Sequence, residues 1–589
     1  MKRTDVPKER KWDLTPLFQT EQDWENEYRA LKEEESKYGN YRGTLTPETA
    51  YVALDAIGDF SRRLERLYMY AALKKDENTA DSHAQELLGR VENLNVSFGS
   101  RTAYVSPELA GWSEKDLEEC AKKAEYARHS VFLRNVIEEK KHILSASEEQ
   151  ILAEYSLFTG DFKHIFTMLD NADLSFKEVS DGKGGKIKLS HGVYSMLLQN
   201  QSQEVRKEAF ETYYAAYSAL KNTIASTYAG SVKKDCAVAK VRRYESAMKR
   251  ALDAEFITPV VYDNLIEAVE EGTPKVHEYV ALRKKALGLK ELHMYDMYVP
   301  ITEGFRLELG YDEAFDLVEE ALKPLGEDYL KVLREGRHGG WIDVEETENK
   351  RSGAYSWGAY DGHPYVLLNY QPVAHDVFTI AHEMGHAIHS YRSNAAQCYE
   401  QAGYEIFVAE VASTVNEVLL LKHLLKTATG ELRAGLLSYY LDMFRTTLFR
   451  QTMFAEFEKY SHEETEKGNA LTADGMDAYY YELNKKYYGP AVVHDEQIAT
   501  EWMRIPHFYN AFYVYKYATG LTSAINIAAN ILKDEGFQKK YFEFLSAGGS
   551  KKPLETLLLA GVDLTKKEPF AVAMKEFSDT LEELKRVMA

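Results

Sequence analysis

The residues best suited to chemistry are His382, Glu383 and His386, which form the pattern H-E-x-x-H within the apolar stretch 377–386. Residues four positions apart share one face of a helix, so the two imidazoles can point at one position. Neutral imidazole nitrogen is a common zinc ligand. Glu383 projects about 100° further round the helix, where a carboxylate can hold and deprotonate a metal-bound water. The pattern therefore predicts a zinc site on a helix.

Two features of this stretch bear on whether it forms a zinc site or only packs in the core. The pattern also arises by chance in long chains, and two histidines on a buried helix face can serve packing alone. Gly385 lies inside the helical stretch, although glycine costs about 1 kcal/mol there relative to alanine. Its presence predicts that another segment packs closely at this point. A third ligand at a suitable distance along the chain would favour the zinc site over packing.

A catalytic zinc site needs a third protein ligand and leaves one position for water. The longer pattern H-E-x-x-H-x-x-G-x-x-H does not fit, because its last two defined positions hold His389 and Arg392. The other arrangement takes a glutamate from a second helix downstream. The candidates for that ligand are Glu400, Glu405, Glu410 and Glu417.

Glu410 is the best of these candidates, because it lies in the apolar helical stretch 407–420. A carboxylate buried there is costly unless it is paired or bound to a metal. Glu400 and Glu405 lie in a stretch that indicates a loop bending at Gly403. Glu417 shares the helix face of Glu410 and can orient a metal-binding histidine through a hydrogen bond. The alternative for Glu417 is a position at a solvated helix end. Ser413 and Thr414 are further candidates for that orienting role.

The chain resembles the oligoendopeptidase F family, which belongs to the thimet-oligopeptidase-like zinc peptidases. The resemblance rests on three blocks, at residues 382–386, 407–414 and 505–520. It implies a mainly α fold with a zincin-like catalytic core and a small β-sheet beside the H-E-x-x-H helix. It also implies a helical N-terminal region that covers this core, and a deep substrate channel. The implied activity is cleavage of short peptides, with one zinc ion on His382, His386 and Glu410.

The third block supplies further candidates, His507, Tyr513, Tyr515 and Tyr517. Peptide hydrolysis passes through a tetrahedral intermediate, whose oxyanion needs hydrogen-bond donors. If the stretch is helical, Tyr513 and Tyr517 share a face; if it is extended, Tyr513, Tyr515 and Tyr517 do. We assign oxyanion stabilisation to His507 and Tyr515, with Tyr513 next. The alternative for each of them is a place in the core.

Most of the chain shows helical periodicity. The glycine-rich stretch 181–186 lacks the Gly-Lys-Ser/Thr ending of a phosphate loop, and its alternating flanks predict a β-hairpin near 176–189. Short strands with glycine-containing turns follow at 340–370. The predicted organisation is a helical N-terminal region, 1–195, and a catalytic domain, 196–589.

Within that catalytic domain we expect the small sheet at 340–370 and zinc helices at 374–391 and 406–421. A sheet edge can hold a peptide in an extended conformation through main-chain hydrogen bonds, whatever its side chains. The segments expected to line such a groove are 353–357 and 358–363.

The composition describes a soluble globular protein with a net charge of −21, from 72 Lys and Arg against 93 Asp and Glu. This excess of acidic residues argues against a nucleic-acid partner. Three widely spaced cysteines indicate no disulfide framework, and no apolar segment has the length of a membrane span. We expect a cytoplasmic protein whose partners are short peptides, and neither nucleic acid nor membrane.

The sequence thus predicts a zinc metalloendopeptidase that hydrolyses short oligopeptides through a zinc-bound water and Glu383 as general base. The alternative is a catalytically silent helical scaffold that binds peptides and carries a structural metal. The intact Glu383 and the lack of a fourth protein ligand favour the enzyme.

Overall fold

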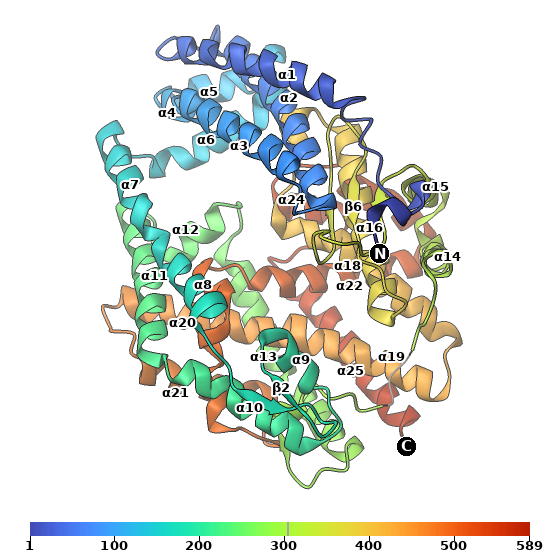
Figure 1. Cartoon of the computed structure of the whole chain (residues 1–589). Helices are drawn as coiled ribbons and strands as arrows, with labels where there is room; N and C mark the ends of the chain where they lie inside the picture. Colours follow the sequence, from blue (N-terminus) through green and yellow to red (C-terminus); the bar gives the residue numbers. More distant parts are fainter. Residues whose placement is uncertain (303–305) are drawn as a thin grey trace. The chain divides into compact units, whose positions relative to one another are not determined.

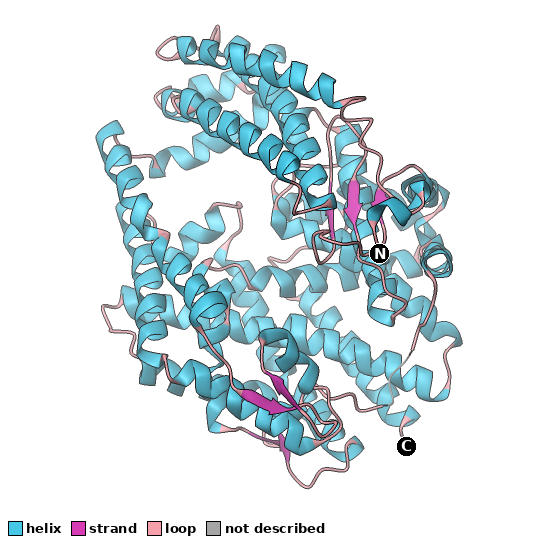
Figure 2. Cartoon of the chain, viewed as in Figure 1, coloured by secondary structure: helices cyan, strands magenta, loops and turns pink. Residues whose placement is uncertain are grey.

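The computed structural model describes residues 1–302 and 306–589, without the side chains of Ala146, Gln150, Ala153 and Leu157. Helices form most of the described chain, and the strands are few and short (Figure 2). The predicted mainly α fold is confirmed. None of the described helices combines the length and hydropathy needed to cross a membrane. The cytoplasmic location stays a prediction.

The chain forms two compact units, each built from three segments. The first unit contains Met1–Ala146, Leu307–His423 and Ile527–Val562. The second contains Ser147–Arg306, Leu424–Asn526 and Asp563–Ala589. Each unit draws on residues from both sides of position 195, and the division into regions 1–195 and 196–589 stays a prediction.

The first unit carries the H-E-x-x-H helix, and Figure 1 shows its helices. They are α1 (Glu21–Glu34), α2 (Ala50–Glu77), α3 (Ser82–Thr102), α4 (Val105–Ala110), α5 (Glu114–Cys120), α6 (Ser130–Glu139), α14 (Tyr311–Ala321), α15 (Glu327–His338), α16 (Ala374–Ala396), α17 (Tyr399–Ala402), most of α18 (Ile406–Thr427), α23 (Gln538–Leu545) and α24 (Pro553–Leu559).

A three-stranded sheet lies beside α16 in this unit, as predicted. Its strands are β4 (Ile342–Asp343), β5 (Tyr355–Trp357) and β6 (Tyr365–Leu367), in the order β4-β6-β5. The central strand β6 runs parallel to β4 and antiparallel to β5, with Val366 opposite both Ile342 and Ser356. Because β6 is buried along its whole length, it anchors the sheet, and β5 forms an edge beside α16.

The N-terminal helices pack on this sheet through one hydrophobic core. Helix α2 contributes Phe60, Leu64 and Leu67, which join Tyr365 and Leu367 of β6 in that core. A reciprocal cap between Thr20 and Asp23 starts α1, which adds further apolar side chains. Within the first unit, the N-terminal helices therefore hold the sheet in place beside α16.

The second unit is also mainly helical. Its helices are most of α7 (Ala146–Thr159), α8 (Asp161–Met168), α9 (His191–Leu197), α10 (Gln203–Ser218), α11 (Lys221–Val241), α12 (Ala247–Asp253), α13 (Pro259–Ala286), α19 (Gly430–Met443), α20 (Arg450–Glu466), α21 (Ala473–Tyr488), most of α22 (Tyr515–Lys533), and α25 (Glu568–Val587). The predicted hairpin is confirmed as the antiparallel pair β1 (Glu178–Ser180) and β2 (Lys186–Lys188), and β3 (Leu292–His293) pairs with β7 (Val492–Val493).

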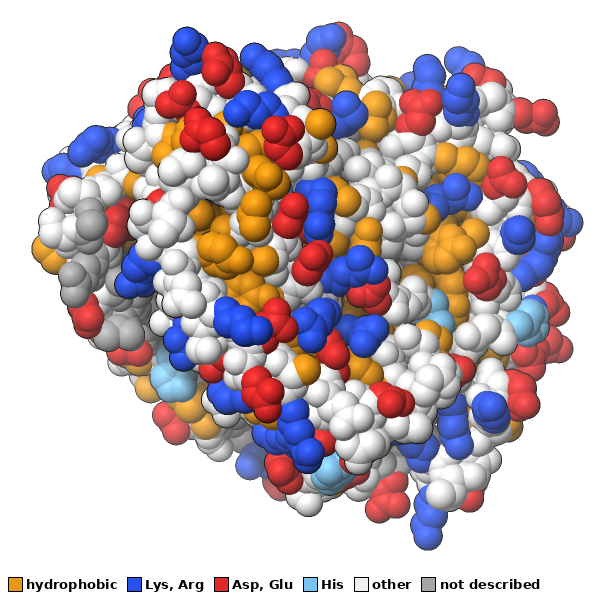
Figure 3. All heavy atoms as spheres, turned by 90° about the horizontal axis from the view of Figure 1, so that it is seen from above, with side chains coloured by type: hydrophobic (Ala, Val, Ile, Leu, Met, Phe, Trp, Pro, Cys, Tyr) orange, Lys and Arg blue, Asp and Glu red, His pale blue; other side chains and the backbone are white. Residues whose placement is uncertain are grey.

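The face shown in Figure 3 carries Lys and Arg side chains interspersed with Asp and Glu. The net charge of the whole chain is −21. Phosphate backbones are recognised by clusters of basic side chains. The expectation that nucleic acid is not a partner stays a prediction.

Candidate metal centre

His382, Glu383 and His386 all lie on α16, which is helical as predicted. The helix ends at Ala396 rather than at residue 391, because the additional residues include neither glycine nor proline. Its rotation is set by a side that is buried in the first unit, formed by Val377, Ile380, Ala381, Met384, Ala387 and Ile388. On the other side the imidazoles stay partly accessible, with 27% of His382 and 17% of His386 exposed.

Helix α18 packs closely against α16 at Gly385. A Cβ added there would lie 2.6 Å from the Cα atom of Ser413, a distance at which the backbones would have to separate. One turn further on, the Nδ2 atom of Asn416 donates a hydrogen bond to the carbonyl oxygen of Ala381 at 2.9 Å. These two contacts fix the register of the helices, and Figure 1 shows them side by side. The close packing predicted from Gly385 is confirmed.

A Gly385→Ala substitution is expected to destabilise the protein by about 1–3 kcal/mol, the usual cost of forcing extra volume into a packed core. It should also weaken metal binding, because α18 carries Glu410 and must move away. Thermal unfolding and zinc titration measure the two effects. Gly403→Ala is the matched control, because no atom lies within 4 Å of its added Cβ. Wild-type stability in Gly385→Ala would contradict the close approach.

The register of the two helices brings Glu410 to the two histidines. The Nε2 atoms of His382 and His386 are 3.2 Å apart, and the Oε2 atom of Glu410 lies 3.6 Å and 3.8 Å from them. Four ligands at about 2.0–2.1 Å from a tetrahedral zinc ion are separated from one another by about 3.3 Å. The three ligand atoms therefore fit one zinc ion in both chemical type and spacing.

The Oε1 atom of Glu417 contacts the Nδ1 atom of His382, the ring nitrogen that is not directed at the shared position. This contact leaves Nε2 pointing at the shared position, which is the usual arrangement behind a metal-binding histidine. Helix α18 continues to Thr427 rather than ending at residue 421, so Glu417 does not lie at a solvated helix end.

The other candidates make different contacts. Ser413 donates a hydrogen bond to the carbonyl oxygen of Glu410 at 2.9 Å. Glu400 lies on α17 and is bound by Arg128 at 2.6 Å.

The pKa values of the titratable groups in this cluster are shifted in different directions. Burial raises the pKa of Glu383, which is 7% exposed, to about 7. Burial also opposes the charge on His382, but the hydrogen bond and charge of Glu417 outweigh it and raise the pKa of His382 to about 9. Burial and the charge of His382 hold the pKa of His386 well below its usual value. A cation that binds His382 must therefore displace a proton.

Substituting Glu417 by glutamine is expected to lower zinc affinity by about 10–100-fold, the typical effect of removing a group that orients a metal ligand. The amide keeps the shape of the side chain but loses the charge that fixes the His382 ring. Competition with a chromophoric chelator measures the affinity. Glu335→Gln makes the same chemical change on an exposed carboxylate of α15 and should leave the affinity unchanged. Equal affinities in the two variants would rule out the orienting role.

The second unit holds the other predicted residues. His507 lies in a 3-10 turn at Pro506–Tyr509, Tyr513 follows that turn, and Tyr515 and Tyr517 lie in the first turn of α22. The ring centroids of His507 and Tyr513 are 5.9 Å apart, and those of Tyr513 and Tyr517 are 5.6 Å apart. The Tyr517 hydroxyl and the Nε2 atom of His507 are within hydrogen-bonding distance at 3.3 Å. All three side chains are partly exposed. They form one cluster of donors, which we call the His507 cluster.

Tyr515 is placed differently from the residues of this cluster. Its side chain is 1% exposed, and its ring centroid lies 5.1 Å from that of Tyr262. Helix α22 begins at Tyr515, so Tyr517 projects about 200° away from it around the helix. The structure therefore places Tyr515 in the core, while Tyr517, the fourth candidate, is a partly exposed tyrosine beside His507. The helical alternative, in which Tyr513 and Tyr517 pair, is the signal that could have found Tyr517. The catalytic role of Tyr515 stays a prediction.

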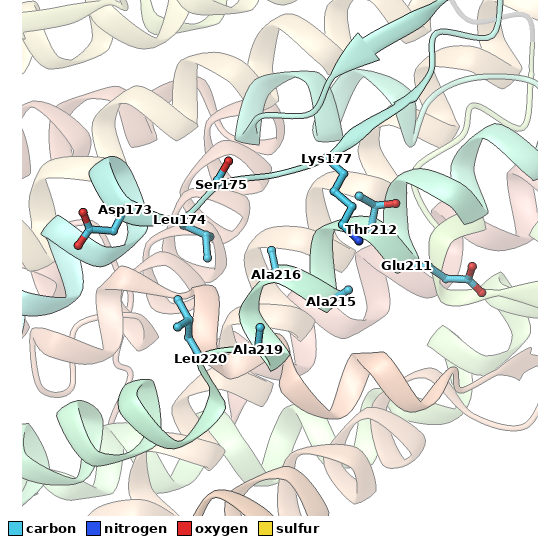
Figure 4. Close-up of a pocket in the computed structure, with 10 residues that line it drawn as sticks. All are labelled: Asp173, Leu174, Ser175, Lys177, Glu211, Thr212, Ala215, Ala216, Ala219 and Leu220. Atoms are coloured by element: carbon cyan, nitrogen blue, oxygen red, sulfur yellow. The ribbon is translucent and has the colours of Figure 1, made fainter.

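Of two cavities in the structure, one is lined by residues close to the H-E-x-x-H pattern and the other is not. A cavity of about 170 Å³ lies one turn before His382, and it is lined by Gly353, Ala354, Leu368, Asn369, Tyr370, His375, Asp376 and Thr379. Another, of about 530 Å³, lies in the second unit (Figure 4). In Figure 4 the carboxylates of Asp173 and Glu211 lie at opposite ends of its lining and point apart. The larger cavity includes none of the predicted site residues.

Comparisons with known proteins agree with the geometry of the metal centre. The sequence profile described as Peptidase family M3 matches residues 196–576, and that described as Oligopeptidase F matches residues 108–176. The chain is 40% identical to Oligopeptidase PepF of Bacillus subtilis, over 100% of this chain and 88% of that protein.

Two solved structures share the fold. A putative peptidase from Chlamydophila abortus has a TM-score of 0.94 at 33% identity, covering 100% of this chain and 99% of that one. Oligoendopeptidase-F from Enterococcus faecium has a TM-score of 0.75 at 34% identity, covering 96% of this chain and 99% of that one. The chain therefore belongs to peptidase family M3, in the oligoendopeptidase F family that its motifs resemble.

Proposed function

We propose that this protein is a zinc metalloendopeptidase that hydrolyses peptide bonds within short oligopeptides. The strongest support is the geometry of His382, His386 and Glu410. Their candidate ligand atoms all lie within 4.8 Å of one another. Membership of peptidase family M3 supports peptide hydrolysis as the reaction. The names of its relatives, oligopeptidase and oligoendopeptidase, support short peptides as substrates and internal bonds as targets.

In this mechanism His382, His386 and Glu410 would hold the metal, and Glu417 would keep the His382 ring in its binding orientation. Zinc, when bound, would supply Lewis acidity that acidifies a water and polarises the scissile carbonyl. The carboxylate of Glu383 would take the proton of the attacking water and then give it to the leaving amine. Burial raises the pKa of Glu383 to about 7, which suits a group that must accept and release a proton near neutral pH.

The His507 cluster would supply hydrogen-bond donors to the oxyanion. Burial, together with the charges of Arg450 and Lys163, lowers the pKa of His507, so its ring is neutral at neutral pH. A neutral ring has one N–H and one acceptor nitrogen. In the proposal the hydroxyl groups of Tyr517 and Tyr513 would be the donors, and the Tyr517 hydroxyl lies 3.3 Å from Nε2 of His507.

A Tyr517→Phe substitution is expected to lower kcat by about 10²–10³-fold, the usual cost of removing one oxyanion donor. KM and zinc content should change little, because the ring and its packing remain. The informative comparison is Tyr515→Phe, which should keep near-normal kcat because Tyr515 is buried. Steady-state kinetics on one peptide measures both variants. A kcat loss in Tyr515→Phe alone would restore the assignment made from the sequence.

We further propose that the peptide binds in extended form along β5, at residues 353–357. This segment is at a sheet edge, and a Cβ added at Gly353 would meet no atom within 4 Å. The alternative segment, 358–363, is engaged in packing. Gly358 lies against Ser390, with only 2.3 Å to an added Cβ, and Asp361 is bound by Arg62 at 2.7 Å. The cavity of about 170 Å³ begins at Gly353 and could take a substrate side chain.

The proposed function is tested with an internally quenched peptide, before and after removal of metal by a chelator. Cleavage that stops on chelation and returns with zinc is the expected result, with internal fragments in the mass spectrum. Release of single residues from one end would indicate an exopeptidase instead. Peptide binding without any cleavage in the zinc-loaded protein would favour the silent scaffold and reject the enzyme.

A further inference from the structure

The second unit contains a fully buried carboxyl group that has no part in the proposed mechanism. Glu458 on α20 has 0% of its surface exposed. Its Oε1 atom accepts a hydrogen bond from the main-chain N–H of Phe512 at 2.6 Å. Its Oε2 atom has no hydrogen-bond partner among the described residues. A buried polar atom without a partner is costly, so this side chain calls for a structural or functional reason.

The residue that Glu458 holds has an unusual backbone conformation. Phe512 has a φ of 55°, in the left-handed region that residues other than glycine rarely adopt. Its ring is also fixed, with centroid distances of 4.6 Å to His462 and 5.7 Å to Tyr262. Strained positions of this kind persist only where the surroundings enforce them, and they concentrate at functional sites. Here Glu458 holds the backbone of Phe512, while packing holds its ring.

This strained turn lies between the members of the His507 cluster. His507 precedes it, and Tyr513 follows it directly before α22 begins at Tyr515. A return of Phe512 to an ordinary φ would redirect the chain that follows. The rings of Tyr513 and Tyr517 would then leave the ring of His507, from which their centroids are now 5.9 Å away.

We propose that Glu458 is a positioning residue that holds the Phe512 turn and thereby sets the geometry of the His507 cluster for the reaction. This inference rests on the catalytic role proposed above for that cluster. Glu458 acts through its acceptor atom and not through a charge. Burial raises the pKa of Glu458 well above its usual range, against the opposing hydrogen bond from Phe512, and the nearby Asp235 adds to the rise. A neutral amide of the same shape can therefore replace it.

Three variants of one residue test the role. Glu458→Gln keeps an acceptor oxygen at the same reach and should keep kcat within about twofold. Glu458→Asp and Glu458→Ala withdraw the acceptor from Phe512, and they should lower kcat by about 10²-fold, the effect of a misplacement of about 1 Å. KM and zinc content should remain close to wild type. Glu463→Gln, at an exposed position on the same helix, is the matched control and should leave kcat unchanged.

Hydrogen exchange of the peptide covering residues 507–517 gives an independent readout. Exchange there should rise in Glu458→Asp and stay at the wild-type level in Glu458→Gln. The proposal is overturned if Glu458→Asp keeps its kcat, or if Glu458→Gln loses as much as Glu458→Asp. It is also overturned if Glu458→Asp and Glu458→Ala both fail to fold, because the carboxyl group would then support the whole unit and not this loop.

The same kinetics distinguish this inference from the proposed function. Wild-type kcat in both Tyr517→Phe and His507→Ala would remove the catalytic role of the His507 cluster itself. A loss of kcat in those two variants, with none in Glu458→Asp, would leave the cluster in place and reject only the role of Glu458.

Discussion

A Glu383→Gln protein is expected to bind zinc like the wild type and to lose about 10²–10⁴-fold in kcat, the range that a positioned general base contributes. Glutamine fills the same space on α16 and still offers an oxygen to a water molecule, but its amide cannot take up a proton. The carboxyl group of Glu383 is not among the three groups proposed to bind the metal. Its removal should therefore leave the metal in place. Metal analysis and kcat on a quenched peptide measure the two properties on one preparation.

Glu335→Gln, on the exposed side of α15, controls for the loss of one negative charge elsewhere in the first unit. It should leave kcat and zinc content unchanged. Near-normal turnover in Glu383→Gln would remove Glu383 from the mechanism. Loss of zinc from the same variant would make Glu383 a metal ligand, and the set of His382, His386 and Glu410 would then need revision.

A Glu410→Ala protein is expected to lose its zinc on dialysis and to show no activity at zinc concentrations that saturate the wild type. The effect should exceed the roughly 10–100-fold fall in affinity expected for the orienting residue Glu417. Two imidazoles remain in this variant, but the ligand from α18 is gone. Elemental analysis after dialysis measures the loss. Full zinc occupancy in Glu410→Ala would reject the ligand set.

Thermal unfolding of Glu410→Ala gives a second readout, the change in stability with and without zinc. Burial raises the pKa of Glu410, which means that folding disfavours its charged form. Removal of the side chain should therefore leave the metal-free protein at least as stable as the wild type near neutral pH. Zinc at about 100 times its Kd should stabilise the wild type by about 2.7 kcal/mol and the variant not at all. Equal stabilisation of both proteins would place the metal elsewhere.

The cluster of His382, His386 and Glu410 could be predicted from the sequence because its signals are local. The two histidines are one helical turn apart, and Glu410 stands out as a carboxylate in an apolar helical stretch. Gly385 marked the contact between the two helices, since only a residue without a Cβ allows α16 and α18 to approach so closely. The role of Glu417 stayed open, because its contact with His382 joins residues 35 positions apart.

The proposed oxyanion donors were harder to predict, because contacts far away in the sequence decide the conformation of their segment. The choice between Tyr515 and Tyr517 depends on where α22 begins, and that depends on the left-handed turn at Phe512. The turn is held by Glu458, which is 54 residues away in the chain. Local residue types do not reveal such a contact. The ends of α16 and α18 were missed for a simpler reason, because no glycine or proline marks the predicted ends.

Anomalous diffraction at the zinc absorption edge, on crystals of the zinc-loaded Glu383→Gln protein, examines the metal centre most directly. The expected result is one strong peak per chain, at about 2.0–2.2 Å from Nε2 of His382, Nε2 of His386 and a carboxylate oxygen of Glu410. A crystal whose only peak lies away from these three side chains, or in which Glu410 is turned away from the metal, would contradict the proposed centre and with it the hydrolytic mechanism.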